Sequence, residues 1–275
     1  MSLAARSTAA RPQVMGIVNV TPDSFSDGGR FFDPAEGIEH ARRLIPQGAD
    51  ILDIGGESTR PGATPVSAFE EIRRVVPVIE AVRAASAVPI SIDTMKAEVA
   101  RAAVKAGARI WNDVSALRFA PEAPEVAAEL GCEVVLMHML GEPGTMQEAP
   151  RYDDVVAEVE AFLLARAFTA MAAGVAKEKI WLDPGIGFGK TVEHNLALLA
   201  ALPRFVALGY PILLGASRKR FIAGVDPSAR EADDRLGGSL AAHLAAAAAG
   251  VAAVRVHDVR ETVQALAVQA AIASA

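Results

Sequence analysis

Several short apolar runs of this chain end on side chains that could bind or act on a small molecule. The first run, Val14 to Val20, carries Asn19 near its end and leads into a polar, glycine-rich loop. The same pattern recurs along the chain, and the polar residues found at or just after the ends of later runs are Asp93, Asn112, His138, Asp183, Ser217, Arg255 and His257. Parallel strands that direct such residues to one rim are typical of an enzyme.

The basic members of this set favour an anionic ligand. Arg60, Lys219, Arg255 and His257 predict a positively charged rim that suits a group such as diphosphate. Asn19 together with a divalent ion would serve the same anion, because Mg²⁺ usually keeps most of its waters and takes few protein ligands.

The remaining members favour flat ligands. Asp93, Asn112 and Asp183 offer acceptors to a planar heterocycle that is rich in N–H donors. Three further side chains could form an apolar sandwich around a second flat molecule: Phe25, Pro61 and Phe188. The chain shows no Ser-His-Asp or Cys-His pairing at readable spacing and no zinc motif, which argues against hydrolysis by those routes.

Each acidic or imidazole side chain also has a purely structural interpretation. Asp93 could be a helix N-cap as readily as a catalyst. For Asp113 a structural role in the following loop is the better prediction, and His138 fits a hydrogen-bonded rim residue. Asp53 lies inside an apolar run, which indicates a supporting role. The glycine-rich stretch 183–190 lacks the spacing of a P-loop, which argues against a nucleotide triphosphatase.

The elements that must position these residues alternate between strand and helix. Expected strands are Val14–Val20, Ile51–Ile54, Pro89–Ile92, Arg109–Trp111, Val134–Met137, Ile180–Leu182, Pro211–Leu214 and Ala253–Val256. Segments of helical period between them include Ala35–Pro46, Ser67–Ala84, Lys96–Ala106, Tyr152–Ala173, Glu193–Ala200 and Asp234–Ala249. This alternation predicts an α/β fold, a single-domain (β/α)8 TIM barrel over residues 13–275 behind a flexible N-terminus at 1–12. An open doubly wound sheet is the competitor, but it usually carries a glycine fingerprint after its first strand.

Composition narrows the kind of protein further. The net charge of −6 argues against non-specific nucleic-acid binding, and the 52% of hydrophobic residues can build a sizeable core. The lone Cys132 excludes an intrachain disulfide and is expected to be a small buried hydrophobe. No apolar run reaches the roughly 18 residues of a membrane span, so a cytoplasmic protein without a membrane partner is expected.

Several longer motifs together resemble one family, the dihydropteroate synthases of folate biosynthesis, which sulfonamides target. The matching segments are Met15 to Gly29, Asp53 to Ala63, Ser91 to Thr94, Asn112 to Val114, Met137-His138, Asp183 to Lys190, Ser217 to Lys219 and Arg255 to Val259. The resemblance implies a TIM barrel that joins 6-hydroxymethyl-7,8-dihydropterin diphosphate to p-aminobenzoate and releases diphosphate. It also implies Mg²⁺ as cofactor and a homodimer.

The resemblance also implies a role for each matching residue. The pterin pocket would comprise Asp93, Asn112, Asp183 and Lys219. The diphosphate site would comprise Asn19, Arg60, Arg255 and His257, with Asn19 at the metal. The p-aminobenzoate pocket would comprise Phe25, Thr59, Arg60, Pro61, Phe188 and Ser217. Catalysis would rest on Asp93, Lys219, Arg255 and His257.

Two departures from the family pattern stand out, Ile186 in place of an aromatic residue and Arg220 in place of a serine. Arg220 could bind the p-aminobenzoate carboxylate or be solvated.

Two alternative functions stay open. A pterin-binding methyltransferase domain, serving a corrinoid protein, would have no use for the diphosphate residues. A non-catalytic paralogue would bind pterin without turnover.

Overall fold

The computed structural model describes residues 11–21, 34–58, 64–141 and 144–275. The predictions for Phe25, Thr59, Arg60 and Pro61, and most of the predicted flexible N-terminus, fall outside these residues. Arg11, the first described residue, forms an ion pair with Asp50 at 2.8 Å.

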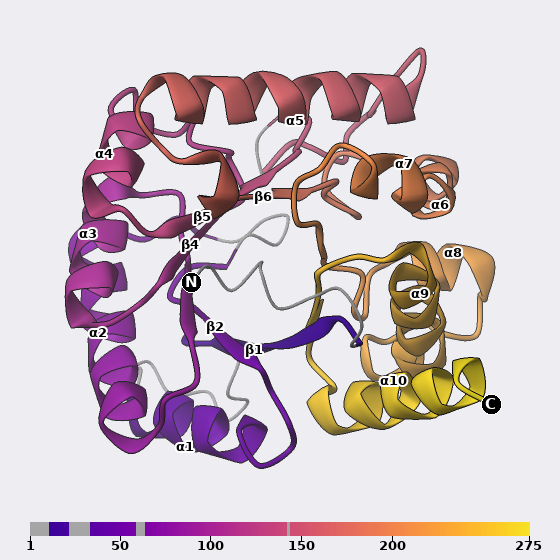
Figure 1. Cartoon of the computed structure of the whole chain (residues 1–275), viewed down its shortest axis with the longest axis horizontal. Coiled ribbons are helices and arrows are strands. Elements are labelled where there is room, and N and C mark those ends of the chain that lie inside the picture. Colours follow the sequence, from indigo (N-terminus) through magenta and orange to yellow (C-terminus); the bar gives the residue numbers. More distant parts are fainter. Residues whose placement is uncertain (1–10, 22–33, 59–63, 142–143) are drawn as a thin grey trace.

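Eight parallel strands form a nearly closed barrel, as the sequence predicts (Figure 1). Their bounds are β1 Gln13–Asn19, β2 Ile51–Gly55, β3 Ile90–Asp93, β4 Ile110–Asp113, β5 Glu133–Met137, β6 Ile180–Asp183, β7 Leu213–Leu214 and β8 Ala253–Val256. The strands are hydrogen-bonded in the order β6-β5-β4-β3-β2-β1-β8-β7. A single bridge between Leu182 and Ile212 links β6 to β7 and closes the ring.

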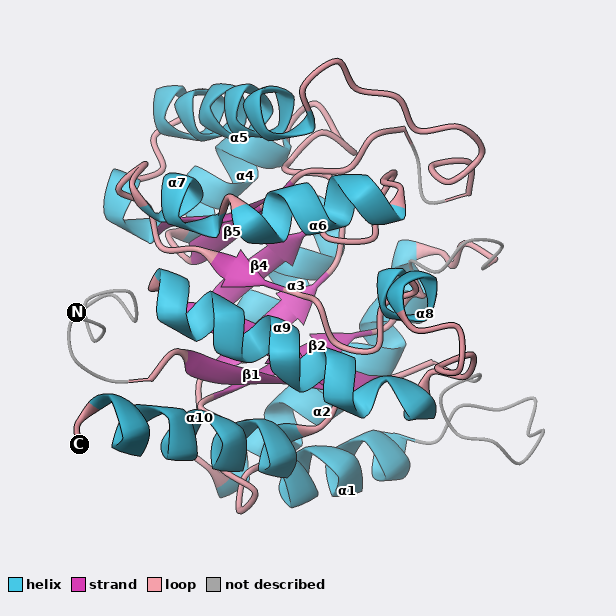
Figure 2. Cartoon of the chain, turned by 90° about the vertical axis from the view of Figure 1, so that its right-hand side faces the viewer, coloured by secondary structure: helices cyan, strands magenta, loops and turns pink. Residues whose placement is uncertain are grey.

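Helices surround this barrel (Figure 2). Their bounds are α1 Pro34–Leu44, α2 Ala68–Ala85, α3 Ala97–Ala106, α4 Ala123–Leu130, α5 Val155–Ala172, α6 Val192–Ala200, α7 Leu202–Val206, α8 Phe221–Val225, α9 Leu236–Ala249 and α10 Val259–Ala273. Helices α4, α7 and α8 were not among the predicted segments, because runs of five to eight residues are too short to show a helical period. The helix ends carry residue types that are typical of caps. The Ser67 hydroxyl accepts the Glu70 N–H at the start of α2, and Gly107 ends α3.

The alternation of side chains along each strand separates two apolar layers. Residues such as Val14, Leu52 and Val254 point outward and pack under the helices. Their neighbours point inward and fill the barrel with an apolar plug, which comprises Met15, Ile51, Ile110, Val135, Trp181, Leu213, Ala252 and Ala253. The Trp181 indole donates to the buried Glu133 carboxylate at 2.6 Å, which fixes the plug.

Within the described ranges, no helix is both long enough and apolar enough to cross a bilayer. Cys132 is buried, which confirms the prediction of a small buried residue, and burial raises the pKa of its thiol to about 11.

Candidate active site

The residues that follow the plug along the strands turn their polar side chains into the barrel. Asp53, Asn112, Asp183 and Arg255 each lie two positions after a plug residue, and a strand repeats its facing direction every two residues. Four strands that are far apart in the sequence therefore deliver these side chains to one level, toward the carboxyl ends of the strands. This is the end at which barrel enzymes build their sites.

Arg255 is the hub of this level. Its Nε donates to Asp53 Oδ2 at 2.5 Å and its Nη2 donates to Asp93 Oδ2 at 2.7 Å. The Asn112 amide donates to the same Asp53 oxygen at 3.2 Å. Asp53 is fully buried and binds both Arg255 and Asn112. This supporting role agrees with the place of Asp53 inside the apolar run. Asp93 caps no helix, since α3 begins after Lys96, and its carboxylate instead accepts the bond from Arg255.

Burial and charge set the protonation of this hub. Burial raises the pKa of Asp93 to about 7, even though Arg255 favours the carboxylate. Burial alone would lower the pKa of Arg255, but the charges of Asp53 and Asp93 outweigh it and raise that pKa above its ordinary value. The guanidinium therefore remains a permanent positive charge, while Asp93 titrates near neutrality.

Asp183 and Lys219 form a second group beside the hub. The Asp183 carboxylate accepts the Gly185 N–H at 2.7 Å, and burial raises the pKa of this carboxyl to about 6. The Lys219 ammonium lies 4.0 Å from the centroid of the Phe188 ring, which is a cation–π contact. The structure thus brings together a predicted pterin residue and a predicted p-aminobenzoate residue.

The charge of His257 differs from the predicted positive charge. Burial and the nearby Arg255 lower the pKa of its imidazole to about 3, so His257 is neutral and adds no positive charge to the rim. The Ser217 hydroxyl accepts the His257 backbone N–H at 3.2 Å and lies 3.0 Å from Nδ1. The hydroxyl accepts one bond and can donate the other, and in the tautomer in which Nδ1 accepts that bond the imidazole proton lies on Nε2. His257 is therefore a neutral imidazole that Ser217 orients, and it can donate from Nε2 in this tautomer.

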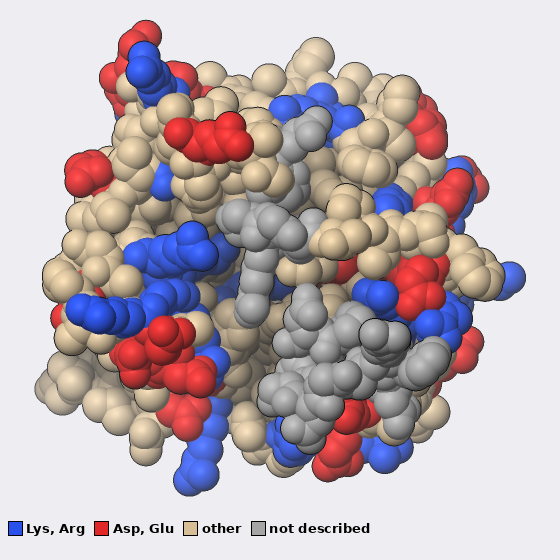
Figure 3. Space-filling model, turned by 180° about the vertical axis from the view of Figure 1, so that it is seen from behind, with Lys and Arg blue, Asp and Glu red and all other residues tan. Residues whose placement is uncertain are grey.

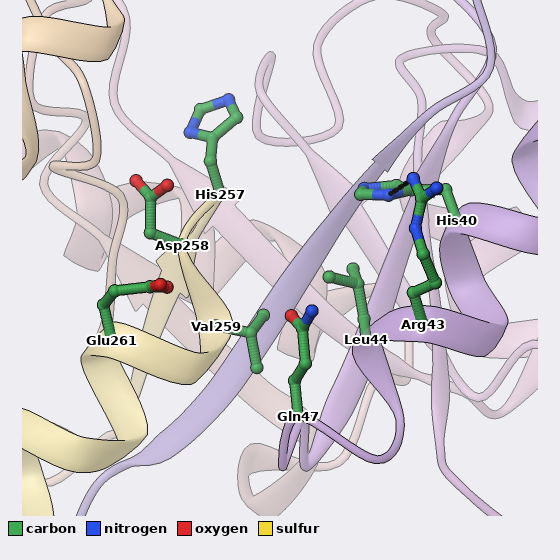
Figure 4. A pocket seen from close by; sticks show the side chains of 8 residues that line it. All are labelled: His40, Arg43, Leu44, Gln47, His257, Asp258, Val259 and Glu261. Carbon is green, nitrogen blue, oxygen red and sulfur yellow. Dashed lines mark hydrogen bonds between the residues drawn. The ribbon is translucent and has the colours of Figure 1, made fainter.

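A cavity of about 240 Å³ opens beside His257, between α1 and the start of α10 (Figure 4). Arg43 donates to His40 Nδ1 at 3.2 Å on its α1 side. Asp258, on the other side, is held by Arg218 at 2.6 Å. Of the residues that line this cavity, only His257 belongs to the predicted site.

Asp113 and His138 have the structural roles that the sequence favours. Asp113 accepts the N–H groups of Ser115 at 2.7 Å and Leu117 at 2.8 Å, and so holds the loop after β4. His138 is buried at the end of β5 and contacts the Lys190 ammonium. Sequence reasoning singled out neither Lys190 nor the bonds of Asp53 to Arg255 and Asn112. The period-two alternation around Ile51 and Asp53 could have revealed the inward direction of Asp53.

The face behind the view of Figure 1 is hollowed near its centre, and Lys and Arg side chains gather on one side of the hollow (Figure 3). Arg220, at the start of α8, is exposed. Asn19 ends β1, the strand beside β8. Among the described residues, no group of three or more His, Cys, Asp or Glu side chains could hold a metal. A magnesium ion that takes one amide oxygen and otherwise binds water and phosphate does not need such a group.

The comparisons with known proteins agree with this geometry. Residues 15–257 match the family model described as pterin binding enzyme. The chain is 50% identical to dihydropteroate synthase of Escherichia coli strain K12, with 100% of this chain and 98% of that protein covered.

Solved structures give the same result. One is Xanthomonas albilineans dihydropteroate synthase with 4-aminobenzoic acid, at 54% identity and a TM-score of 0.90, covering 98% of this chain and 96% of that one. Another is the enzyme of the same organism in complex with 7,8-dihydropteroate, at 50% identity and a TM-score of 0.88, covering 100% and 99%. The chain belongs to the dihydropteroate synthase family of pterin-binding enzymes.

Proposed function

We propose that this chain condenses 6-hydroxymethyl-7,8-dihydropterin diphosphate with p-aminobenzoate and releases diphosphate and 7,8-dihydropteroate. The observation that carries the proposal is the convergence of Asp93, Asn112, Asp183 and Arg255 at the carboxyl ends of the strands, where Arg255 binds Asp93 and, through Asp53, is linked to Asn112. The complexes of the Xanthomonas albilineans relative with 4-aminobenzoic acid and with 7,8-dihydropteroate support it.

The pterin ring would lie against the buried carboxylates. Asp93 and Asp183 can each accept from the ring's N–H groups, and Asn112 can both donate and accept. Because these side chains come from strands rather than loops, they hold their positions before the ligand arrives. The pterin pocket would meet the p-aminobenzoate pocket at Lys219, and its contact with the Phe188 ring supports this.

The reaction breaks the C–O bond of the hydroxymethyl diphosphate, and the leaving diphosphate takes the electron pair. The dihydropterin ring stabilises the resulting methylene cation, and the Asp93 carboxylate favours that positive charge. Arg255 has five N–H donors, and the carboxylates use two in this structure, so the guanidinium can also bind the departing anion. His257 donates from Nε2 to the same anion.

The p-aminobenzoate amine then attacks the methylene carbon, forms the C–N bond and loses a proton. The pocket contributes mainly by orienting the amine. Asn19 would hold Mg²⁺, which when bound neutralises part of the diphosphate charge.

The test is an assay of the purified chain with pterin diphosphate and Mg²⁺, with and without p-aminobenzoate. We expect diphosphate and dihydropteroate to form in equal amounts, and EDTA to abolish turnover. Binding of pterin diphosphate without turnover would instead identify a non-catalytic paralogue. Binding of methyl-folate but not of the diphosphate would identify the methyltransferase.

The titration of Asp93 predicts a pH dependence. Because the pKa of this carboxyl is about 7, the carboxylate that favours the cation is lost as the pH falls through 7. We expect kcat/KM for pterin diphosphate to fall about tenfold per pH unit below that value. Asp93→Asn should be slow and lack this limb. A variant that kept the same inflection would assign the titration to another group.

Arg220 predicts a substrate-specific effect. If its guanidinium binds the carboxylate of p-aminobenzoate, Arg220→Ala should raise KM for p-aminobenzoate about tenfold, which matches the loss of one charge-assisted hydrogen bond. KM for pterin diphosphate should not change. Arg109→Ala, which removes an exposed arginine at the opposite end of the barrel, is the matched control. Equal KM values in both variants would make Arg220 a solvated residue.

A homodimer in the cytoplasm completes the proposal. Helix α10 exposes Val268 and Ile272, whereas α9 packs on the barrel through Ala242 and Ala246. The outer face of α10 is therefore the better candidate for pairing between copies. Sedimentation equilibrium measures the mass, and a monomer at micromolar concentration would contradict this part of the proposal.

A further inference from the structure

Lys190 is a buried lysine that the proposed reaction does not use, and burial lowers the pKa of its ammonium to about 7. Only 4% of its surface is exposed, and it follows a glycine-rich loop, Pro184 to Gly189, at the end of β6. A lysine is almost never so deeply buried without partners that satisfy its charge. Its partners therefore indicate what it does.

The hydrogen bonds of the Lys190 ammonium join the ends of two neighbouring strands, β5 and β6. It donates to the Phe188 carbonyl at 3.0 Å, within its own loop. It also lies 2.9 Å from His138 Nδ1 and donates to the His138 carbonyl at 3.4 Å, both at the end of β5. Burial lowers the pKa of His138 to about 3, so this imidazole is neutral and Nδ1 can accept the bond.

Other side chains hold the same loop. The Tyr152 hydroxyl donates to the Gly189 carbonyl at 2.8 Å. The Gln147 amide donates to the Gly187 carbonyl at 2.6 Å, and Asn195 Oδ1 accepts the Gly187 N–H at 2.7 Å. With Lys190, these bonds fix the backbone on both sides of Phe188.

The loop also packs backbone to backbone against the segment after β5. A Cβ at Gly189 would lie 2.7 Å from the Leu140 carbonyl oxygen. The loop therefore has little room to shift toward β5. The hydrogen bonds described above resist its movement away from β5. The Phe188 ring carried by this restrained loop lies 4.0 Å from the Lys219 ammonium, measured to the ring centroid.

We infer that Lys190 is a positioning residue that holds the backbone of Phe188 against His138 and so keeps the Phe188–Lys219 stack in place for the flat substrates. The inference rests on the proposed function, because it assigns Phe188 to the p-aminobenzoate pocket. Lys190 itself touches no reacting atom and acts through Phe188.

A double-mutant cycle tests this role. Lys190→Met keeps the length of the side chain and removes its three donors. We expect kcat/KM for p-aminobenzoate to fall about 100-fold, as for a misplaced binding group. KM for p-aminobenzoate should rise more than KM for pterin diphosphate. Lys179→Met is the matched control, since Lys179 donates to the Gly131 carbonyl far from the loop.

The second arm is Phe188→Leu, alone and combined with Lys190→Met. If Lys190 acts through Phe188, the double variant should be within about threefold of the worse single variant. Losses that multiply, or a Lys190→Met enzyme that matches Lys179→Met, would overturn the inference.

A third variant covers the case in which Lys190→Met does not fold. Tyr152→Phe removes one loop bond and keeps the ring, and we expect it to raise KM for p-aminobenzoate several-fold and to couple with Phe188→Leu. If the effects of Tyr152→Phe and Phe188→Leu on KM simply multiplied, the result would count against a positioning role of the side chains that hold the loop. If the unmodified chain binds p-aminobenzoate in the presence of pterin diphosphate but does not turn over, the proposed function fails. The cycle can then be run on binding instead.

Discussion

Arg255→Met is expected to destabilise the folded chain by about 3 to 5 kcal/mol and to abolish synthase turnover. The guanidinium is the positive partner of both Asp53 and Asp93, which lie 2.5 and 2.7 Å from it inside the barrel. A methionine would leave two carboxylates facing each other with no positive partner. In addition, the leaving diphosphate would lose the guanidinium that we propose as its donor.

Urea unfolding at pH 8 measures the loss of stability. Arg101→Met is the control, because Arg101 pairs with Glu129 on the surface, where an ion pair contributes about 0 to 1 kcal/mol. Adding Asp53→Asn to Arg255→Met removes one of the two stranded charges and should restore part of the stability without restoring turnover. A single variant as stable as the control would mean that the buried carboxylates do not depend on Arg255.

The pKa of Asp93 gives the sign of the pH dependence of stability. This carboxyl has a higher pKa in the folded chain, about 7, than its ordinary value of 3.8. The folded state therefore binds the proton more tightly, and the contribution of Asp93 is full below pH 3.8 and is lost as the pH rises through 7. The destabilisation caused by Arg255→Met should be larger at pH 8 than at pH 5, because only the ionised carboxyl needs the guanidinium.

Gly185→Ala is expected to cost about 2 to 5 kcal/mol of stability and most of the activity. Gly185 has a φ of +68°, which strains any residue with a Cβ, and an added Cβ would lie 1.9 Å from the His138 carbonyl oxygen. The backbone must move to relieve this clash. Because the Gly185 N–H is bonded to Asp183, the movement displaces a predicted pterin residue.

Two other glycines separate the causes of this effect. Gly209 has a φ of +75°, and a Cβ added there would meet open space. Gly209→Ala should therefore cost only the backbone strain, about 1 kcal/mol. Gly237→Ala, within α9, meets neither strain nor contact and should be neutral or stabilising. Thermal unfolding ranks the three variants. If Gly185→Ala were no worse than Gly209→Ala, the close approach of the loop to β5 would have no energetic consequence.

The sequence predicts the barrel well because apolar runs and helical periods repeat along the chain. Strand bounds shift by one or two residues, and the shifts matter at the site. Asp93 and Asp183 belong to β3 and β6 rather than following them, which sets their carboxylates inside the barrel. Residue type and place also predict the supporting role of Asp53.

Pairings between distant strands could not be predicted in this way. The bond of Arg255 to Asp53 spans 202 positions and depends on the closure of the barrel, which no local pattern encodes. The same holds for His257, whose residue type suggests a charge but whose burial beside Arg255 keeps it neutral. The glycines of the loop after β6 suggest a phosphate cradle by type, yet Gly185 and Gly189 reflect close backbone packing.

The apolar plug beneath the site also constrains the order of events. Because Met15, Trp181 and the residues around them fill the barrel, the substrates and products must pass through the same opening. A pterin against Asp93 and Asp183 would lie deeper than an amine beside Phe188. The enzyme should therefore follow a compulsory binding order, pterin diphosphate first. An excess of p-aminobenzoate that occupied the entrance early would slow turnover rather than speed it.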